Sequence, residues 1–220
     1  MNQPSISTPS YSKRRIGTLQ ALSAPLGLTI AELLSLANKA EGLYRLAKSI
    51  PKPDGSIRNT YDARAPLKAV HARIKTQILD HVVYPAYLTG SLKGSDYKVN
   101  ATWHSGAKIV INEDISGFFP STTAGSVFRV WNNLLGFSKE VAQCLTQLTT
   151  LDGALPQGAI TSSFLANLIF WQDEPTLHSE LTSRGLVYTR YVDDIAVSSA
   201  TVLTNDEKSD VISKVYGMLL

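Results

Sequence analysis

Cysteine is almost absent from this chain, which has a single one, Cys144, among 220 residues. A lone cysteine has no partner for an internal disulfide, and its place in the apolar, helix-like run 141–148 predicts a buried structural thiol, not a nucleophile. No apolar run reaches the length of a membrane span, and the first 15 residues lack the apolar core of a signal peptide. These absences predict a soluble, cytoplasmic protein in a reducing setting, with no membrane partner.

The net charge is also small, at +3, which is too little to indicate nucleic-acid binding by itself. Its distribution is uneven, because residues 1–110 contain 15 Lys and Arg against 6 Asp and Glu, whereas residues 111–220 contain 6 against 12. A basic half beside an acidic half suits a lobe that holds phosphates next to a lobe that holds metal ions. Ordinary solvated surface charge explains this difference equally well.

Hydrophobic spacing, capping boxes and turn residues predict a mixture of helices and short strands. Helices are expected from residue 29, from 66, at 123–135, 138–150 and 159–171, and from 204. Strands are expected at 108–115 and in two hairpins, near 49–58 and near 186–197, the first with its turn at 53–55. Residues 1–12 are expected to be disordered, and residues 88–100 to form an irregular connection.

Two adjacent acids, Asp193 and Asp194, follow Tyr191 and Val192 at the tip of the second expected hairpin. Acids between apolar segments are costly to fold and are useful chiefly for holding cations. A hairpin tip is one of the few places where neighbouring Asp side chains can approach a single site, since side chains alternate between faces along a strand. The pair therefore indicates a divalent metal site, with an ordinary acidic turn as the alternative.

Asp114 is the natural partner of that turn, because it ends the short apolar strand expected at 108–115. Two metal ions about 3.5–4 Å apart need carboxylates from at least two separate strands. Magnesium takes oxygen ligands and keeps positions for water and phosphate, which fits Asp side chains without a His or Cys cluster. A helix N-cap or a satisfied acid at the end of a strand is the alternative for Asp114.

A third segment, Leu155-Pro-Gln-Gly-Ala-Ile-Thr-Ser-Ser163, precedes the helix expected at 159–171. Gly158 at the mouth of a helix lets the backbone approach a ligand closely, and a helix N-terminus favours an anion. Gln157 offers a donor and an acceptor to a sugar or base. A helix-starting loop without a ligand is the alternative.

Taken in order, these segments resemble the motifs of reverse transcriptases. Asp114-Ile-Ser-Gly-Phe-Phe matches their first catalytic-aspartate motif, Leu155-Pro-Gln-Gly their Leu-Pro-Gln-Gly segment, and Tyr191-Val-Asp-Asp their signature hairpin. Residues 50–58 resemble the fingers hairpin, and the likeness covers roughly residues 40–217. Asn100-Ala-Thr-Trp-His104 is similar to the Asn-Ala-x-x-His motif of bacterial retron enzymes, which makes these the most similar group.

This resemblance implies an α+β fold of the right-hand polymerase type, with fingers and a palm whose antiparallel sheet is backed by helices. It implies a partly disordered leader at 1–28, fingers with N-terminal helices at 29–107, and a palm at 108–220. Part of 120–160 is expected to contribute to the fingers. The palm would be truncated before the thumb, which is absent from this chain.

The resemblance also implies a role for each matching residue. Asp114 and Asp193 would be the principal ligands of two Mg²⁺ ions, for which Mn²⁺ could substitute, supported by the Ile115 carbonyl and Asp194. The incoming nucleotide would meet Lys52, Arg58, Gln157, Gly158 and a sugar gate that is either Phe118 or Phe119. Tyr191 and Val192 would lie along the primer terminus, and Asn100 and His104 would recognise RNA. A structural hydrogen-bonding histidine is an equally good explanation of His104.

The implied function is an RNA-directed DNA polymerase that copies a structured non-coding RNA into DNA from deoxynucleoside triphosphates. An effector protein as a further partner, and a role in antiviral defence, are implied only by the resemblance to retrons. One alternative is another bacterial reverse transcriptase, from a group II intron, a diversity-generating element or a phage-defence system. Another is a non-catalytic RNA-binding half of a split or truncated enzyme.

Overall fold

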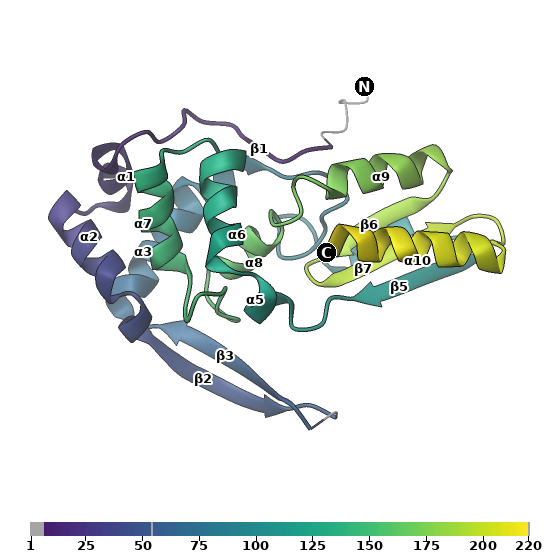
Figure 1. The fold of residues 1–220 in the computed structure, drawn as a ribbon, viewed down its shortest axis with the longest axis horizontal. Helices are drawn as coiled ribbons and strands as arrows, with labels where there is room; N and C mark the ends of the chain where they lie inside the picture. Colours follow the sequence, from purple (N-terminus) through teal and green to yellow (C-terminus); the bar gives the residue numbers. More distant parts are fainter. Residues whose placement is uncertain (1–6, 54, 220) are drawn as a thin grey trace. The chain divides into compact units, whose positions relative to one another are not determined.

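The computed structural model describes residues 7–53 and 55–219 and divides them into two compact units (Figure 1). We call residues 7–9, 84–116 and 170–219 the sheet unit, and residues 10–53, 55–83 and 117–169 the helix unit. The boundary predicted between fingers and palm, after residue 107, falls inside the sheet unit, because residues 84–107 pack with strands from later in the chain. The names fingers and palm therefore stay predictions.

The sheet unit is built on a three-stranded antiparallel sheet in the order β5-β7-β6 (Figure 1). Its strands are β5 (Ile109–Asp114), β6 (Val187–Tyr191) and β7 (Asp194–Ser199). The predicted strand at 108–115 and the predicted hairpin near 186–197 are thus confirmed. The central position of β7 sets the acidic hairpin directly beside the strand that ends at Asp114.

The two faces of this sheet differ, because successive side chains on a strand point to opposite sides. Tyr188, Ile195 and Val197 belong to an apolar core that also contains side chains of α9 (Glu174–Ser183) and α10 (Asn205–Leu219). On the other face Val110, Asn112 and Asp114 are exposed. The sheet is therefore backed by helices on one side and open along β5 on the other, the side that carries the acids.

Two further predictions about the sheet unit have definite outcomes. The capping box before the last helix is confirmed, since the Thr204 amide and hydroxyl both donate to Glu207 and the Glu207 amide donates to the Thr204 hydroxyl. The irregular connection expected at 88–100 is wrong beyond residue 96, where α4 (Tyr97–Trp103) begins. Asp96 caps this helix by accepting from the amides of Lys98 and Val99, a local signal that reads equally as a turn.

The helix unit packs helices around α7 and carries a two-stranded hairpin (Figure 1). Its helices are α1 (Leu19–Leu26), α2 (Ile30–Lys39), α3 (Ala65–Gln77), α5 (Phe118–Ser121), α6 (Ala124–Arg129), the π-helix η3 (Val130–Leu134), α7 (Lys139–Thr149) and α8 (Ser162–Ala166), with the 3₁₀ turns η1 (Glu41–Leu43) and η2 (Leu79–His81). Its strands are β1 (Ser10–Tyr11) paired with β4 (Val82–Val83), and β2 (Tyr44–Pro51) paired with β3 (Ile57–Ala63).

The helices predicted from 29, from 66, at 123–135 and at 138–150 are confirmed as α2, α3, α6 with η3, and α7. The Thr29 capping box is complete, because the Thr29 amide donates to Glu32 and the Glu32 amide donates back to the Thr29 hydroxyl. The hairpin predicted near 49–58 is confirmed and is longer than expected. One residue of its expected turn, Asp54, lies outside the described residues.

Three other expectations in the helix unit need correction. The disorder expected at 1–12 is wrong for Ser10 and Tyr11, which form β1 and pair with Val83 and Val82 of β4. The later part of the expected leader at 1–28 contains helix α1, which buries Leu19, Leu22 and Leu26 on one face and holds a proline, Pro25, in its last turn. The first six residues of that leader lie outside the described part of the chain. The helix expected at 159–171 spans only α8, because hydrogen bonds of the i to i−3 type replace the helical pattern after residue 166.

Within the described residues, no single helix is long and apolar enough to cross a bilayer. Only α1 and α2 taken together reach that length and composition, and they are separated by a bend of 85°.

Candidate active site

The acidic hairpin and β5 bring three carboxylates to one end of the sheet. In the strand register Asp114 lies opposite Asp194, which in turn lies opposite Tyr191. Asp193 occupies the turn between Tyr191 and Asp194, and its carbonyl accepts a hydrogen bond from the Ile115 amide at 3.0 Å. The residue directly across from Asp114 in the strand register is thus Asp194. The role of Asp193 as the main partner of Asp114 in metal binding, which the resemblance implies, stays a prediction.

The electrostatics of this end suit a cation. Burial, and after it the nearby Asp114 carboxylate, raises the pKa of Asp194 above its ordinary value. Across the described residues, no group of three or more Asp, Glu, His or Cys side chains is gathered as a complete metal site. Magnesium commonly binds through one or two carboxylates plus water and substrate phosphates, so these oxygen donors fit it as a partial ligand set.

The turn of the acidic hairpin has an unusual backbone. Val192 has a φ of 61°, a left-handed conformation that costs a β-branched residue roughly 1–3 kcal/mol. Gly90 presses against it, since a Cβ built on Gly90 would lie 2.4 Å from the Val192 amide nitrogen. The segment leading to Gly90 runs beside β6, where the Thr89 amide donates to the Arg190 carbonyl and the Arg190 amide donates to the Tyr87 carbonyl.

A buried charged pair underlies the same hairpin. Arg190 on β6 and Glu174 at the start of α9 have side chains that are 0% and 2% exposed. The guanidinium donates from Nε to Oε1 at 2.6 Å and from Nη2 to Oε2 at 2.7 Å. The Tyr188 hydroxyl also donates to Oε1, at 2.7 Å. Burial would lower the pKa of Arg190, but the ion pair with Glu174 outweighs it and raises that pKa.

Sequence reasoning missed Arg190, Glu174 and Gly90. One signal was present, because Arg190 is a charged residue on a strand whose neighbours are apolar or uncharged. Charged residues are almost never fully buried unless they are paired, so a position that alternation assigns to the core implies a buried partner. Nothing in the sequence names that partner as Glu174.

Asn100 and His104, expected to recognise RNA, both contact the hairpin and its neighbouring segment. The Asn100 side-chain oxygen accepts from the Thr89 hydroxyl at 2.7 Å. The two ring nitrogens of His104 lie 2.7 Å from the Ser198 hydroxyl and 2.8 Å from the Thr189 hydroxyl, and burial lowers the pKa of the ring. These contacts favour the structural explanation of His104, while RNA recognition by the motif stays a prediction.

The residues expected to meet the nucleotide lie in the helix unit. Arg58 on β3 is exposed and pairs with Ile50 on β2, and Lys52 is half-buried at the end of the hairpin. The Gln157 carbonyl accepts from the Tyr61 amide at 2.7 Å, which joins the Gln157 loop to β3. The unit therefore brings the Gln157 loop and the basic hairpin together.

The structure explains the glycine at position 158 differently from the sequence-based expectation. Its φ is 99°, and a Cβ built there would lie 3.0 Å from the Tyr61 carbonyl oxygen. The backbone that Gly158 approaches is thus β3. Helix α8 begins only at Ser162 and has five residues, so Gly158 does not stand at a helix mouth. A contact between Gly158 and a nucleotide stays a prediction.

The two aromatic residues proposed as a sugar gate differ in exposure. Phe118 is buried, at 4% exposure, whereas Phe119 is half-buried. Their rings are tilted against each other with centroids 5.9 Å apart. Of the two, Phe119 is the one with surface left to meet a ligand.

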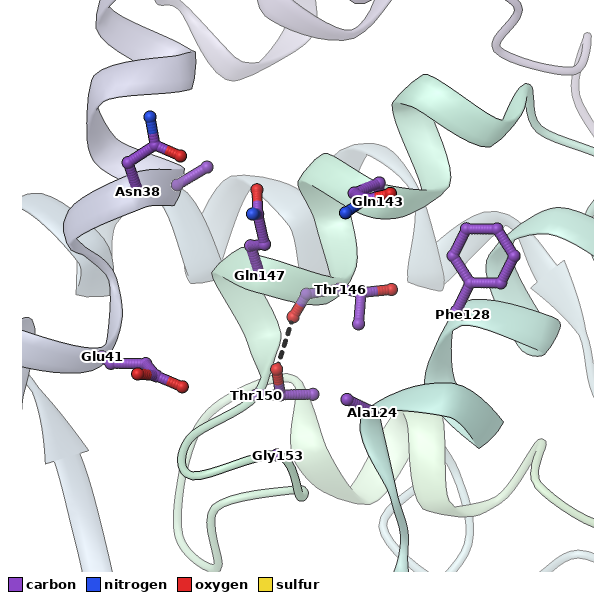
Figure 2. Close-up of a pocket in the computed structure, with 10 residues that line it drawn as sticks. Asn38, Glu41, Ala124, Phe128, Gln143, Thr146, Gln147, Thr150 and Gly153 are labelled. Carbon is purple, nitrogen blue, oxygen red and sulfur yellow. Dashed lines mark hydrogen bonds between the residues drawn. The ribbon is translucent and has the colours of Figure 1, made fainter.

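A separate hollow of about 500 Å³ lies between α2, α6 and α7 in the helix unit (Figure 2). Its polar lining consists of the amides of Asn38, Gln143 and Gln147, the hydroxyls of Thr146 and Thr150, and the carboxylate of Glu41. At the end of α7 the Thr150 hydroxyl donates to the Thr146 carbonyl. Glu41 is its one charged lining residue. None of the residues that the motifs single out lines this hollow, which has no pairing of a nucleophile with a base.

Comparison with known proteins identifies the class of this chain. No family model matches it. Curated reverse transcriptases do match it. The chain is 36% identical over 211 residues to the Retron Se72 reverse transcriptase of Salmonella heidelberg (strain 579083-10). It is 34% identical over 221 residues to the Retron Ec48 reverse transcriptase of Escherichia coli, and each of these two matches covers 96% of the chain. It is 33% identical over 188 residues, 85% of the chain, to the Retron Ec86 reverse transcriptase of Escherichia coli.

Each of these matches is to a retron enzyme, so the predicted resemblance to retron reverse transcriptases is confirmed. The chain spans 56%, 54% and 58% of the lengths of these three relatives. It therefore fits a part of a retron reverse transcriptase.

Proposed function

We propose that this chain forms the fingers and palm of a retron-type reverse transcriptase, an RNA-directed DNA polymerase that copies a structured non-coding RNA. The observation that carries the proposal is the register of the sheet unit, in which Asp114 lies across from Asp194 and next to the turn that holds Asp193. Carboxylates from two strands meet there on an open face, as a two-metal nucleotidyl-transfer site requires. The likeness to retron enzymes supports the same reaction.

In this proposal Asp114, Asp193, Asp194 and the Ile115 carbonyl hold divalent cations, Mg²⁺ or in its place Mn²⁺. When bound, the cations stabilise negative charge on the attacking and leaving oxygens. The protein groups orient the reactants: a primer hydroxyl attacks the α-phosphate of a deoxynucleoside triphosphate and pyrophosphate leaves. The primer end lies along Tyr191 and Val192.

The helix unit supplies the contacts to the nucleotide. Arg58 grips two phosphate oxygens at once, and Lys52 acts as a point charge. Gln157 hydrogen-bonds the sugar, and Gly158 keeps that loop against β3. Phe119, the more exposed of the aromatic pair, excludes a 2′-hydroxyl and so selects deoxynucleotides, while Phe118 packs in the core.

The test is incorporation of a labelled deoxynucleotide on a primed RNA template, with and without the C-terminal part of a retron relative supplied. Asp193→Asn and Asp114→Asn are expected to abolish incorporation, because the amide cannot hold the cation charge. Asp210→Asn is the matched control, since Asp210 pairs with Arg184 on the same unit and away from the acidic turn. If Asp193→Asn and Asp114→Asn incorporate as much deoxynucleotide as Asp210→Asn and the wild-type protein, the proposal is refuted. RNA binding without any incorporation would favour the non-catalytic alternative.

A further inference from the structure

Arg190 of the buried pair with Glu174 makes a third hydrogen bond, which connects the pair to the acidic turn. The Arg190 Nη1 donates to the Val192 carbonyl at 2.8 Å, while Nε and Nη2 are held by the two oxygens of Glu174. A guanidinium is planar and presents its donors in a fixed fork, so two bonds to Glu174 also fix the direction of the third. The carbonyl that precedes Asp193 is therefore held from the helix-backed side of the sheet.

Such a pair is a poor choice for stability alone. Removing two charges from water is expensive, and apolar residues of similar volume often serve a core as well or better. A buried ion pair therefore suggests a need for a defined geometry. Here the geometry concerns Val192, whose positive φ the chain would not adopt readily without support.

A second contact restrains the same turn. Gly90 packs so closely that a Cβ there would lie 2.4 Å from the Val192 amide nitrogen and 2.8 Å from the Tyr191 carbonyl carbon. The Val192 carbonyl is held by Arg190, and its amide side is backed by Gly90. The direction in which the chain enters Asp193 is set by these two contacts.

We propose that Arg190, oriented by Glu174, is a positioning residue that fixes the turn carrying Asp193 and Asp194 for cation binding. This inference rests on the proposed function, because it assigns a purpose to the turn only if these acids bind a metal ion. Lys cannot replace Arg190 here, since a single ammonium on a flexible stem cannot hold both carboxylate oxygens and the carbonyl in one plane.

The test measures Mn²⁺ binding to the 220-residue chain without any catalytic assay, by the paramagnetic broadening of amide NMR signals at residues 193–195. Wild-type protein is expected to show broadening there, and Asp193→Asn to lose it. Arg190→Lys is expected to need about 10- to 100-fold more Mn²⁺ for the same broadening, the usual effect of losing a group that orients a metal ligand. Arg184→Lys, the same exchange in an ion pair near the surface of the same unit, is the matched control and is expected to behave as wild type.

A variant that keeps the fold separates positioning from stability. Combining Glu174→Met, Tyr188→Phe and Arg190→Met replaces the polar network with apolar groups, which often fold as well as the original. This variant is expected to keep the wild-type circular dichroism spectrum and still bind Mn²⁺ at least tenfold more weakly. Wild-type Mn²⁺ affinity in this folded variant would overturn the inference while leaving the proposed function intact. Equal broadening in wild type and Asp193→Asn would overturn the proposed function, and the inference with it.

Discussion

The contact between Gly90 and the acidic turn yields a sharp prediction for Gly90→Ala. The added methyl would lie 2.4 Å from the Val192 nitrogen, 2.5 Å from Val192 Cγ2 and 2.8 Å from the Tyr191 carbonyl carbon. Two of these atoms belong to the backbone, so no side-chain rotation relieves them. Reaching ordinary van der Waals separation from the nearest atom requires the turn or the Gly90 segment to move by about 1 Å.

Overpacking of this kind typically costs about 1–3 kcal/mol. For a chain of this size each kcal/mol lowers the melting temperature by roughly 2–4 °C, so Gly90→Ala is expected to melt roughly 2–12 °C below wild type. Because the strain falls on the turn before Asp193, nucleotide incorporation at a temperature where the variant is folded is also expected to fall.

Gly217→Ala is the matched control for this substitution. Gly217 lies in α10 of the same unit, and a Cβ built there meets nothing within 4 Å. Alanine at such a helical position stabilises by about 0.5–1 kcal/mol, so Gly217→Ala is expected to raise the melting temperature. Thermal unfolding followed by circular dichroism tests both variants. If Gly90→Ala melts at or above the wild-type temperature, the steric argument is wrong.

Two further predictions concern groups that the fold buries. Burial lowers the pKa of His71, His104 and His178. As the pH falls through about 6.5, these histidines therefore take up protons in the unfolded chain before they do so in the folded one, which reduces the free energy of unfolding. Urea midpoints at pH 7.5 and 5.5 test this, and an equal or higher midpoint at pH 5.5 would contradict it. Burial, and after it Glu140, raises the pKa of Cys144 to about 11, so a thiol reagent is expected to label the native protein slowly and the guanidinium-unfolded protein at once. Immediate labelling of native protein would show that the thiol is accessible.

Local patterns predicted most of the elements correctly. The Thr29 and Thr204 capping boxes marked true helix starts, because a cap involves only residues three apart in the chain. Strand β5 and the acidic hairpin followed from short apolar runs around the acids. Helix α1 was missed because it contains Pro25, a residue that usually ends or kinks a helix. Which of its side chains form the apolar face also depends on the segments that it packs against. The helix expected at 159–171 was too long because apolar spacing there did not reveal where helical hydrogen bonding stops.

The candidate site was also predictable only in part: local strings indicated which residues belong to it, but not how these residues are arranged. The identity and order of Asp114, Gln157, Tyr191, Asp193 and Asp194 could be read directly, since each motif is a short local string. Which carboxylate faces Asp114 could not, because strand register depends on the exact turn. The sequence did not distinguish Phe118 from Phe119 either, since exposure is a property of packing.

The amino-acid sequence by itself determined the identity and order of the acids and motifs in which this chain resembles reverse transcriptases, because each motif is a short local string. Only the tertiary structure decided how the acidic turn is held. Arg190 meets Glu174 across 16 residues, and Gly90 meets Val192 from a still more distant segment. Such contacts form when segments distant in the sequence pack together, and their geometry depends on burial and register, which no local pattern encodes.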